Sequence, residues 1–510
     1  MKLPLILGGL TALGLALGVA PGVASAAGEE CVHVVGYESS GEKLTLDPAI
    51  QTSSEDPTML YAVFNRLVDL DASFEPIPEL ADSWEASDDG KSWTFHLKQG
   101  VKFHDGSDFD ANDVVYTYQR LIDPALASPA AAVLSFLTPE GITAVDAHTV
   151  QFTTADPIAE LPLIITTKFT LVVPEGATAE QLRENPIGTG PFSVEKFKIG
   201  DAVRVFRKNP NYWKAGLPKS ECLKVTVAQE GLTAAVALQS GDADLVLSVD
   251  PAAVPQLQGD ANVILLETGA GTSMTFSMQI DVPPFDDVRI RKALKLAIDR
   301  QAMVDTVLLG FGEPGNDNPV PPTWRSAFTD QPLRRDVAQA KALLAEAGHG
   351  AGLSVDLYTA EAIPGMVKSA EVFKAMAEEA GITVNVNVTP AESFWDDVWL
   401  KKSFVTSGWS VRPPIEGLSV AYTKETDWNE THWKRDDFEA LLAQARSELD
   451  PAKRADILKQ AQKLLADEGG VIVAMFVHQI AGLRSACSGF EPHAQNFNLD
   501  YEELACSDKM

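Results

Sequence analysis

The sequence predicts a mixed α/β protein with more than one domain. Its 510 residues are too many for one ordinary hydrophobic core, and its apolar content of 45% is typical of a globular chain. Short strand-like segments alternate with amphipathic helical segments after the first residues. One stretch, 353–388, has the pattern of a strand, a helix and a second strand, which indicates a βαβ unit with parallel strands.

In the first third of the chain, residues 93–97 and 149–153 alternate in polarity as strands do. We expect a helix between them, because Asp110 can cap a segment whose apolar residues fall on one face. Asp113 follows the cap by three residues, close to a capping box.

The second half contains clearer start and stop signals. Strands are expected at 353–357 and 382–388. Helices are expected at 336–347, at 365–380 and from Pro451, capped by Asp450, to the Gly469–Gly470 pair.

The first 26 residues indicate a secretory signal peptide. Lys2 precedes an apolar run over 3–23, and Ala24, Ser25 and Ala26 form a small-residue cleavage site. A transmembrane anchor is the rival interpretation, which the glycines and prolines of the run disfavour. Cys31 does not directly follow the run, so a lipid anchor is not expected. We therefore expect cleavage near Ala26 and a mature protein that does not insert into the membrane.

The net charge is −30, and removal of residues 1–26 with Lys2 leaves −31. Such a surface repels nucleic acid and anionic lipid, so neither is expected as a partner. The four cysteines form no C-x-x-C pair, and an even number in an exported chain favours two disulfides. Four cysteines allow three connectivities. We prefer Cys31–Cys222 and Cys487–Cys506, the second closing a short loop.

The chain contains few segments that match catalytic or metal-binding patterns. The chain has no H-E-x-x-H, G-x-S-x-G or Walker motif. The acidic segment 105–113 resembles a calcium loop, but a loop that starts at Asp108 would need glycine at position 113 and glutamate at position 119. These positions hold Asp113 and Gln119, so a turn followed by a helix cap explains the acidic residues better. The glycine-rich segment 188–192 contains Pro191 and indicates a turn into a strand. We therefore expect no enzyme activity, no metal and no cofactor.

Several longer segments resemble one family. They are LADSWE at 80–85, DGKSWTFHLKQGVKFHDG at 89–106, DANDVVY at 110–116, PIGTGPF at 186–192, KNPNYW at 208–213, SGDAD at 240–244, FDDVRIRKAL at 285–294 and GWS at 408–410. In this order they resemble bacterial extracellular solute-binding proteins of family 5, which include dipeptide-, oligopeptide-, nickel- and opine-binding members. The resemblance covers essentially all of the chain after the signal.

The resemblance implies a periplasmic binding protein fold of type II (cluster C), with two lobes, a hinge and an extra domain. Lobe I would be discontinuous. The implied parts are lobe I at 27–58, 189–276 and 484–510, the extra domain at 59–188 and lobe II at 277–483. A solute would bind between the lobes and be enclosed when they close. The implied partners are a small-molecule or short-peptide ligand and an ABC permease, and the protein would act as a periplasmic monomer.

Arg412 is the most informative candidate site residue. Peptide-binding relatives have an aspartate three residues after the tryptophan of the glycine-tryptophan segment, where it pairs with the peptide's ammonium group. Here Trp409 is followed by Arg412, so the charge is reversed. We expect an anionic ligand group at Arg412. The alternative is that Arg412 pairs with Glu416, or with an acid across the cleft, and only locks the lobes.

The remaining candidates follow from their positions. Trp409 is expected to offer a flat wall to the ligand, and a loop over 428–433 to cover the cleft. Further contacts are expected from Tyr37, Glu38, Ser39, Thr272, Ser273, Met274, Trp428, His432 and Trp433. The structural alternative is packing in a loop for Trp409 and packing at the hinge for Thr272, Ser273 and Met274. His432 is expected to hydrogen-bond rather than to bind a metal.

Three function classes remain after these steps. A binding protein for import explains the signal, the charge and the family motifs, and its ligand would be a short peptide, a peptide-like compound or an opine- or sugar-acid-like solute. A heme- or metal-binding member of the same family and a secreted hydrolase are the alternatives.

Overall fold

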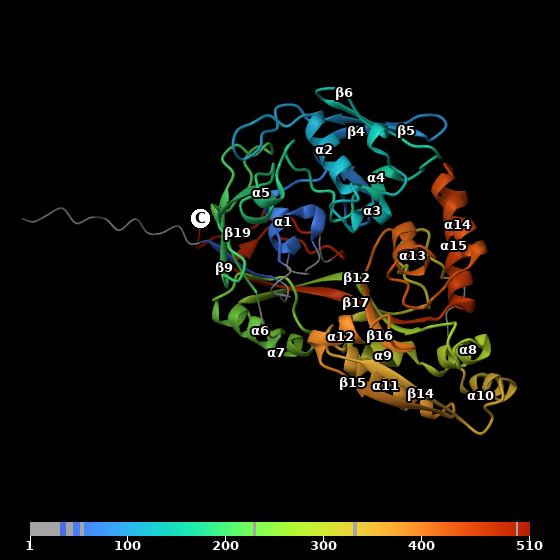
Figure 1. The fold of residues 1–510 in the computed structure, drawn as a ribbon. Coiled ribbons are helices and arrows are strands. Elements are labelled where there is room, and N and C mark those ends of the chain that lie inside the picture. Colours follow the sequence, from blue (N-terminus) through green and yellow to red (C-terminus); the bar gives the residue numbers. More distant parts are fainter. Residues whose placement is uncertain are drawn as a thin grey trace, which may run out of the picture.

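The protein is organised around one large sheet that extends through both lobes (Figure 1). The computed structural model describes residues 31–36, 44–51, 56–227, 231–329, 334–495 and 498–509. Within these ranges the sheet has 11 strands. From one edge to the other they are β15 (Ile382–Val388), β14 (Leu353–Thr359), β16 (Phe404–Ser410), β12 (Val263–Met278), β17 (Val471–Arg484), β11 (Leu245–Val246), β1 (Val32–Gly36), β10 (Cys222–Val227), β9 (Val203–Lys208) and β8 (Phe192–Lys196), while β13 (Gly312–Pro314) pairs with β17 outside this order.

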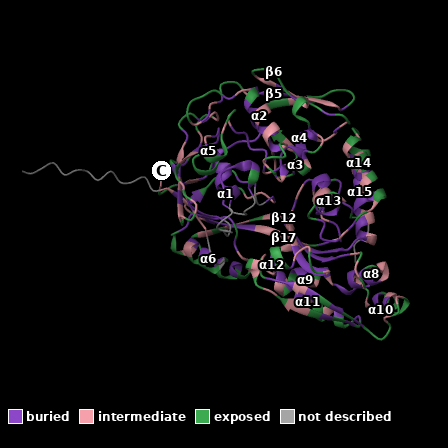
Figure 2. Ribbon diagram, viewed as in Figure 1, coloured by how far each residue is buried: buried purple, intermediate pink, exposed green. Residues whose placement is uncertain are grey.

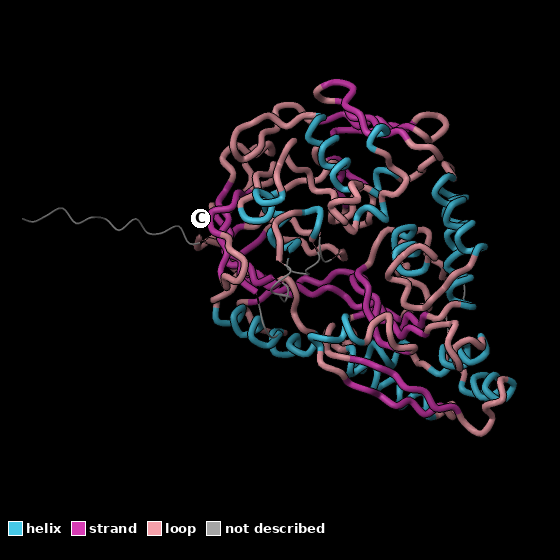
Figure 3. The backbone as a smooth tube through the Cα atoms, viewed as in Figure 1, coloured by secondary structure: helices cyan, strands magenta, loops and turns pink. Residues whose placement is uncertain are grey.

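Two long strands connect the lobes. β12 has 16 residues and β17 has 14, and they run antiparallel along most of their length. At one end β17 pairs with β11, and at the other end β12 pairs with β16. The register shifts on both sides of Ala270, and such irregularities bend and twist a strand pair. The continuous strand path in Figure 3 therefore contains the hinge of the fold.

The lobe around β1 combines distant parts of the chain. β1 lies between β10 and β11 and is parallel to both. Its core joins Val34, Leu223, Leu483 and Tyr501, all of which are buried. The Cys31–Cys222 disulfide spans 191 residues of sequence, and Cys487–Cys506 spans 19. Both expected disulfides are therefore present, whereas the domain boundaries given above remain a prediction.

A second, separate sheet forms the extra domain at the top of Figure 1. Its strands are β4 (Ala81–Ala86), β5 (Ser92–Leu97), β7 (Thr149–Thr153) and β6 (Ile142–Asp146), in this order. The expected helix is α2 (Ala111–Leu121), and the predicted capping box of Asp110 and Asp113 is complete. Strand and helix share one buried core that contains Phe95, Tyr118 and Phe152.

Lobe II contains the predicted βαβ unit. β14 and β15 are parallel, with α11 (Met366–Glu378) between them in sequence. The core of this lobe includes Phe276, Phe373 and Phe404, and buried residues follow the central sheet in Figure 2. The other helices are α1 (Asp56–Val63), α3 (Ala130–Val133), α4 (Leu161–Ile164), α5 (Ala179–Glu184), α6 (Gly231–Ser240), α7 (Val254–Leu257), α8 (Val288–Ala297), α9 (Arg300–Val307), α10 (Val337–Glu346), α12 (Ala391–Asp397), α13 (Pro414–Tyr422), α14 (Asp436–Ser447) and α15 (Pro451–Glu468). Among the described residues, no helix combines the length and apolarity needed to cross a bilayer.

The extra domain and lobe II touch each other directly. Phe74 stacks on Trp324 with ring centroids 4.5 Å apart. Glu160 forms an ion pair of 2.9 Å with Arg454, and the Ala159 backbone N–H donates to the Arg446 carbonyl at 2.8 Å. Because these contacts bridge the space between the lobes, the structure represents a closed arrangement.

Candidate functional site between the lobes

A small pocket lies where β16 leads into α13. Ser273, Trp409, Arg412 and Tyr422 are among the side chains that line it. Ser273 faces Trp409 in the β12–β16 ladder and donates its hydroxyl hydrogen bond to the Trp409 carbonyl at 3.3 Å. The pocket has a volume of about 10 Å³, which is room for one water molecule. In the closed arrangement the pocket is thus nearly filled by side chains.

Arg412 is fixed from two sides. Its Nε lies 3.1 Å from Glu416 Oε1, and its guanidinium carbon lies 5.7 Å from the centre of the Trp409 ring. Burial raises the pKa of Glu416, and the nearby charge of Arg412 opposes that rise. Within the described part of the chain, neither of the two Nη atoms of Arg412 donates a hydrogen bond to a protein acceptor. The fork of the guanidinium is therefore available to an anionic group.

Lys168 brings a second positive charge to this region. It belongs to the extra domain, in the segment that follows α4. Burial and, to a smaller extent, the charge of Arg412 lower the pKa of Lys168 to about 8, whereas Asp56 and Glu416 act in the opposite direction. Two cations from opposite sides of the gap thus share one electrostatic environment.

Four tryptophans form a row next to the pocket. The ring centroids of Trp395 and Trp399 are 5.6 Å apart, those of Trp399 and Trp409 6.0 Å, and those of Trp409 and Trp428 6.1 Å. Glu430 is buried beneath the row and accepts hydrogen bonds from the indole nitrogens of Trp399 at 2.7 Å and Trp409 at 3.0 Å. These bonds fix the orientation of the rings, so Trp409 presents a rigid flat face beside Arg412.

Several of the sequence-predicted site residues gather here and others do not. Ser273, Trp409 and Arg412 line the pocket. Thr272 is half-buried in the adjacent β12, opposite Ser410. Trp428 packs against Trp409 and remains 38% exposed.

Three candidates are placed elsewhere. The Met274 side chain is buried in the lobe II core, and the Trp433 side chain is buried against Phe438. Both placements argue against a side-chain contact with the ligand, because a fully buried side chain offers no surface to a solute. His432 Nδ1 pairs with Asp281 Oδ1 at 2.7 Å. Tyr37, Glu38 and Ser39 lie outside the described residues.

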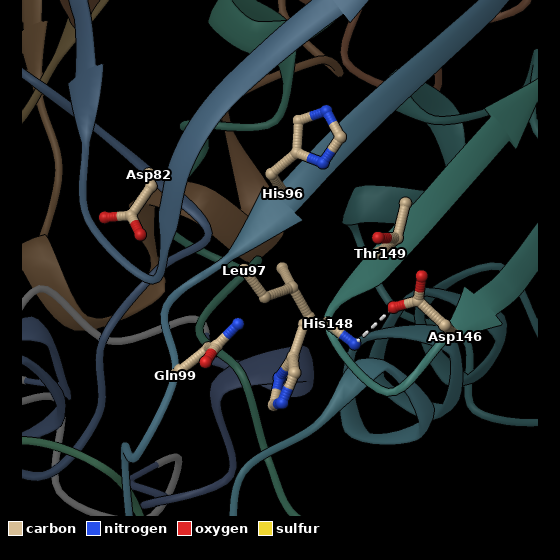
Figure 4. Close-up of a pocket in the computed structure, with 7 residues that line it drawn as sticks. All are labelled: Asp82, His96, Leu97, Gln99, Asp146, His148 and Thr149. Atoms are coloured by element: carbon tan, nitrogen blue, oxygen red, sulfur yellow. Dashed lines mark hydrogen bonds between the residues drawn. The ribbon is translucent and has the colours of Figure 1, made fainter.

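A larger pocket of about 760 Å³ lies on the extra domain. Figure 4 shows its lining at the ends of β5 and β7, with His96 and His148 pointing in different directions. The His148 backbone N–H donates to Asp146 Oδ1 at 2.8 Å. Among the described residues, the only group of three side chains spaced to hold a metal is Asp244, Cys487 and Cys506. Its two sulfurs are bonded to each other, so this group is a covalent crosslink beside an acid.

Two lobes on a shared pair of strands, closed over a charged pocket, define a solute-binding protein. Comparison with known families matches residues 75–430 to the bacterial extracellular solute-binding proteins, family 5 Middle. The chain belongs to this family. It is therefore a bacterial extracellular solute-binding protein, as the sequence predicted.

Named relatives share most of its length. Heme-binding protein A of Haemophilus influenzae is 32% identical over 446 residues, which cover 80% of each chain. The dipeptide-binding protein of Escherichia coli is 28% identical over 98% of this chain and 100% of its own. The periplasmic binding protein DppA of Helicobacter pylori, solved in complex with the peptide STSA, superposes with a TM-score of 0.80 at 23% identity and covers 94% of this chain and 98% of its own. This last likeness supports the fold.

Lys168, Glu430 and Trp399 are not among the individual site residues predicted from the sequence. A signal for Lys168 exists in hindsight, because it is a single lysine inside the apolar segment 161–173. Glu430 and Trp399 carry no comparable signal, since only the tertiary structure brings them to Trp409.

Proposed function

We propose that the protein captures a short peptide or peptide-like solute by lobe closure and holds an anionic group of that solute against Arg412. The observation that carries the proposal is that neither Nη atom of Arg412 donates a hydrogen bond to a described residue, in a pocket lined mainly by residues of β12, β16 and α13. A planar guanidinium binds a carboxylate through two parallel hydrogen bonds. Trp409 supplies a flat apolar wall beside it.

The pairing of Arg412 with Glu416 is compatible with this role. The two residues are one helical turn apart on the same segment, so their ion pair does not join the lobes. It occupies Nε and orients the guanidinium, while both Nη atoms remain for a ligand. The alternative, in which Arg412 only neutralises Glu416, predicts that ligand affinity does not depend on Arg412.

The cellular context of the proposal follows from the family and from the N-terminus. We propose export by the N-terminal segment with cleavage near Ala26, function as a periplasmic monomer and delivery of the solute to an ABC permease in the inner membrane. The ligand stabilises the closed arrangement through contacts with both lobes, and no bond of the solute is made or broken. An opine- or sugar-acid-like solute is the second candidate, because its carboxylate fits the same cation.

Mass spectrometry of the small molecule that co-purifies with the protein is the first experiment. A thermal-shift screen of peptides against organic acids follows, since a ligand that binds the folded state raises its stability. A visible spectrum and elemental analysis of the same sample test the heme- and metal-binding alternatives, and conversion of the solute to a product would reveal a hydrolase.

Arg412→Ala then tests the contact itself. We expect an affinity loss of roughly ten- to a hundredfold, the usual range for a charged hydrogen bond. Arg289→Ala serves as the matched control, because Arg289 pairs with Asp287 on a surface helix of lobe II. Unchanged affinity in Arg412→Ala would end the direct-contact proposal.

A further inference from the structure

Three distant parts of the chain meet at Phe74. The Phe74 ring, in the extra domain, stacks on Trp324 of lobe II with ring centroids 4.5 Å apart. It also meets the ring of His493, in the C-terminal segment, edge-on with centroids 5.1 Å apart. The Phe74 side chain is buried in an apolar cluster with Ala327 and Val411 of lobe II. Phe74 therefore joins the extra domain to lobe II and to the C-terminal segment in the closed arrangement.

A hydrogen-bonded turn presents Phe74 to its partners. The turn connects β2 (Val68–Leu70) to β3 (Pro76–Pro78). The Asp71 carboxylate accepts hydrogen bonds from two backbone N–H groups of the turn, at 2.8 and 2.9 Å. Phe74 has a φ of 61°, which a residue with a Cβ rarely adopts. Such a conformation persists only where the surroundings hold it, so the contacts of the Phe74 ring and the turn depend on each other.

Hydrogen bonds on both ring nitrogens keep His493 neutral. The Gln495 backbone N–H donates to His493 Nδ1 at 3.0 Å. A ring nitrogen that accepts a hydrogen bond carries no proton, so the proton of the neutral ring is on Nε2. Nε2 then donates to the Asp71 carbonyl at 2.9 Å, in the turn that carries Phe74. A second proton, on Nδ1, would displace the Gln495 N–H, so only the neutral ring can keep both bonds.

The nearest charges give little support to a second proton on His493. Burial lowers the pKa of His493 below its usual 6.5, and the charge of Arg66 adds to this effect, while the Asp71 carbonyl and the charge of Asp69 act in the opposite direction. Arg66 and Asp69 form an ion pair with each other. Their opposite effects on the ring therefore offset each other in part.

The other charged groups on the surrounding elements face water. Glu75 of the turn and Arg325, next to Trp324, lie 3.9 Å apart and are 63% and 83% exposed. Glu491, on the same segment as His493, is also exposed. Exposed charges are screened by water and salt, so the geometry of the ring decides its protonation.

We propose that His493 is an acid-sensitive support for lobe closure. Its neutral ring holds the turn that places Phe74 against Trp324, and a second proton on the ring releases the turn and shifts the protein toward an open arrangement. The inference goes beyond the proposed function, because it concerns when the lobes close and not which solute they hold. It rests on that function only in that closure captures the solute.

The direction of the pH effect follows from the protonation of the two arrangements. Opening removes Trp324 and gives water access to the Phe74 and His493 rings, so the pKa of His493 is expected to lie nearer 6.5 in the open arrangement than in the closed one. The closed arrangement then binds fewer protons. Its stabilisation is complete above pH 6.5 and is lost as the pH falls through 6.5 toward the lower closed-state value. Within this window the ratio of closed to open molecules falls by up to about tenfold per pH unit.

Small-angle scattering of the ligand-free protein at pH 7 and pH 5 tests the inference. His493→Asn keeps an oxygen that can accept the Gln495 N–H but does not titrate, and Phe74→Ala removes the ring that the turn presents. His96→Asn is the matched control, because His96 is an exposed residue of β5 in the extra domain. Thermal melting reports whether each variant folds. Nitrogen-15 NMR of labelled histidine gives the tautomer and the pKa of His493, whose signal is the one missing from His493→Asn.

We expect the radius of gyration to be larger at pH 5 than at pH 7 in the wild type and in His96→Asn, and to be the same at both values in His493→Asn. Phe74→Ala should already have the larger radius at pH 7. The inference is wrong if the wild type has one radius at both pH values, if His493→Asn keeps the change, if Phe74→Ala matches the wild type at pH 7, or if the proton of the neutral His493 ring is on Nδ1. The proposed function stands in each of these cases, because the affinity of Arg412→Ala tests it separately.

Discussion

At the scale of single side chains, the environment decides what each residue does. Arg412 was recognised in the sequence as a charge reversal. Whether its guanidinium can bind a ligand depends on the structure, in which Glu416 lies against Nε. Trp433 belongs to the same aromatic loop as Trp428 in sequence, yet one is buried and the other is 38% exposed. Residue type was therefore predictable, whereas exposure was not.

Gly190 is required by close packing of two backbones. A Cβ at this position would lie 2.4 Å from the Val63 carbonyl carbon and 2.7 Å from the Phe64 nitrogen. Rigid backbone cannot yield as a flexible side chain does, so Gly190→Ala is expected to lower the free energy of unfolding by about 2–3 kcal/mol. Denaturant unfolding followed by tryptophan fluorescence measures the change.

Gly417 in α13 provides the comparison for Gly190. A Cβ there would approach nothing closer than 3.8 Å, and alanine is preferred to glycine in a helix by about 0.5–1 kcal/mol. Gly417→Ala is therefore expected to be neutral or stabilising. Equal losses in the two variants would contradict the packing argument.

At the scale of elements, local signals predicted much of the fold. Asp110 with Asp113 marked the start of α2, and Asp450 with Pro451 marked the start of α15. The strand–helix–strand stretch became parallel β14 and β15. Helix caps and hydrophobic periodicity depend on residues that are close in sequence. The elements that they predict are therefore found in the structure.

His478 links the strands of the hinge. Its Nδ1 lies 2.6 Å from Glu267 on β12, and its Nε2 lies 3.6 Å from Glu313 on β13. Glu313 and then Glu267 raise the pKa of His478 above its usual 6.5, against the effect of burial. Since the folded-state pKa is raised, the stabilisation is complete below pH 6.5 and is lost as pH rises through the higher folded value.

We therefore expect His478→Gln to be less stable than the wild type at pH 5.5 and closer to it at pH 8.5. Differential scanning calorimetry across this pH range measures the gap in melting temperature between the two proteins. A gap that stays the same at every pH, or widens as pH rises, would refute the role of the His478 charge.

At the scale of the whole molecule, closure depends on contacts between the extra domain and lobe II. Glu160 and Arg454 are 21% and 11% exposed and form the ion pair across this boundary. Glu160→Gln keeps the shape but removes the charge, so we expect fewer closed molecules and a few-fold loss of ligand affinity, about 1 kcal/mol. Small-angle scattering of the ligand-free protein should show a larger radius of gyration.

The control for closure is Glu195→Gln. Glu195 pairs with Arg207 between β8 and β9, inside one lobe. We expect no change in ligand affinity or in the radius of gyration for this variant. Identical behaviour of the two variants would show that the Glu160 contact does not contribute to closure.

The Cys487–Cys506 disulfide fastens the C-terminal segment. It closes a loop with a sequence separation of 19 and joins β18 (Cys487–Ser488) to β19 (Ala505–Cys506). In the chain-entropy model such a loop is worth about 3 kcal/mol. Replacing both cysteines by serine should therefore lower the free energy of unfolding of the lobe by about this amount, as measured by denaturant unfolding. Replacing only one cysteine by serine should cost the same stability and also leave a free thiol that titration detects.

The sequence alone determined the α/β class, the family, the caps of individual helices and the charge reversal at Arg412, because these depend on local pattern or on residue identity. Only the tertiary structure decided that the charge of Arg412 acts on Lys168, that Glu430 orients two tryptophans and that Met274 and Trp433 are buried. Residues far apart in sequence meet through the packing of whole lobes, and no local pattern encodes the distance or the burial that results.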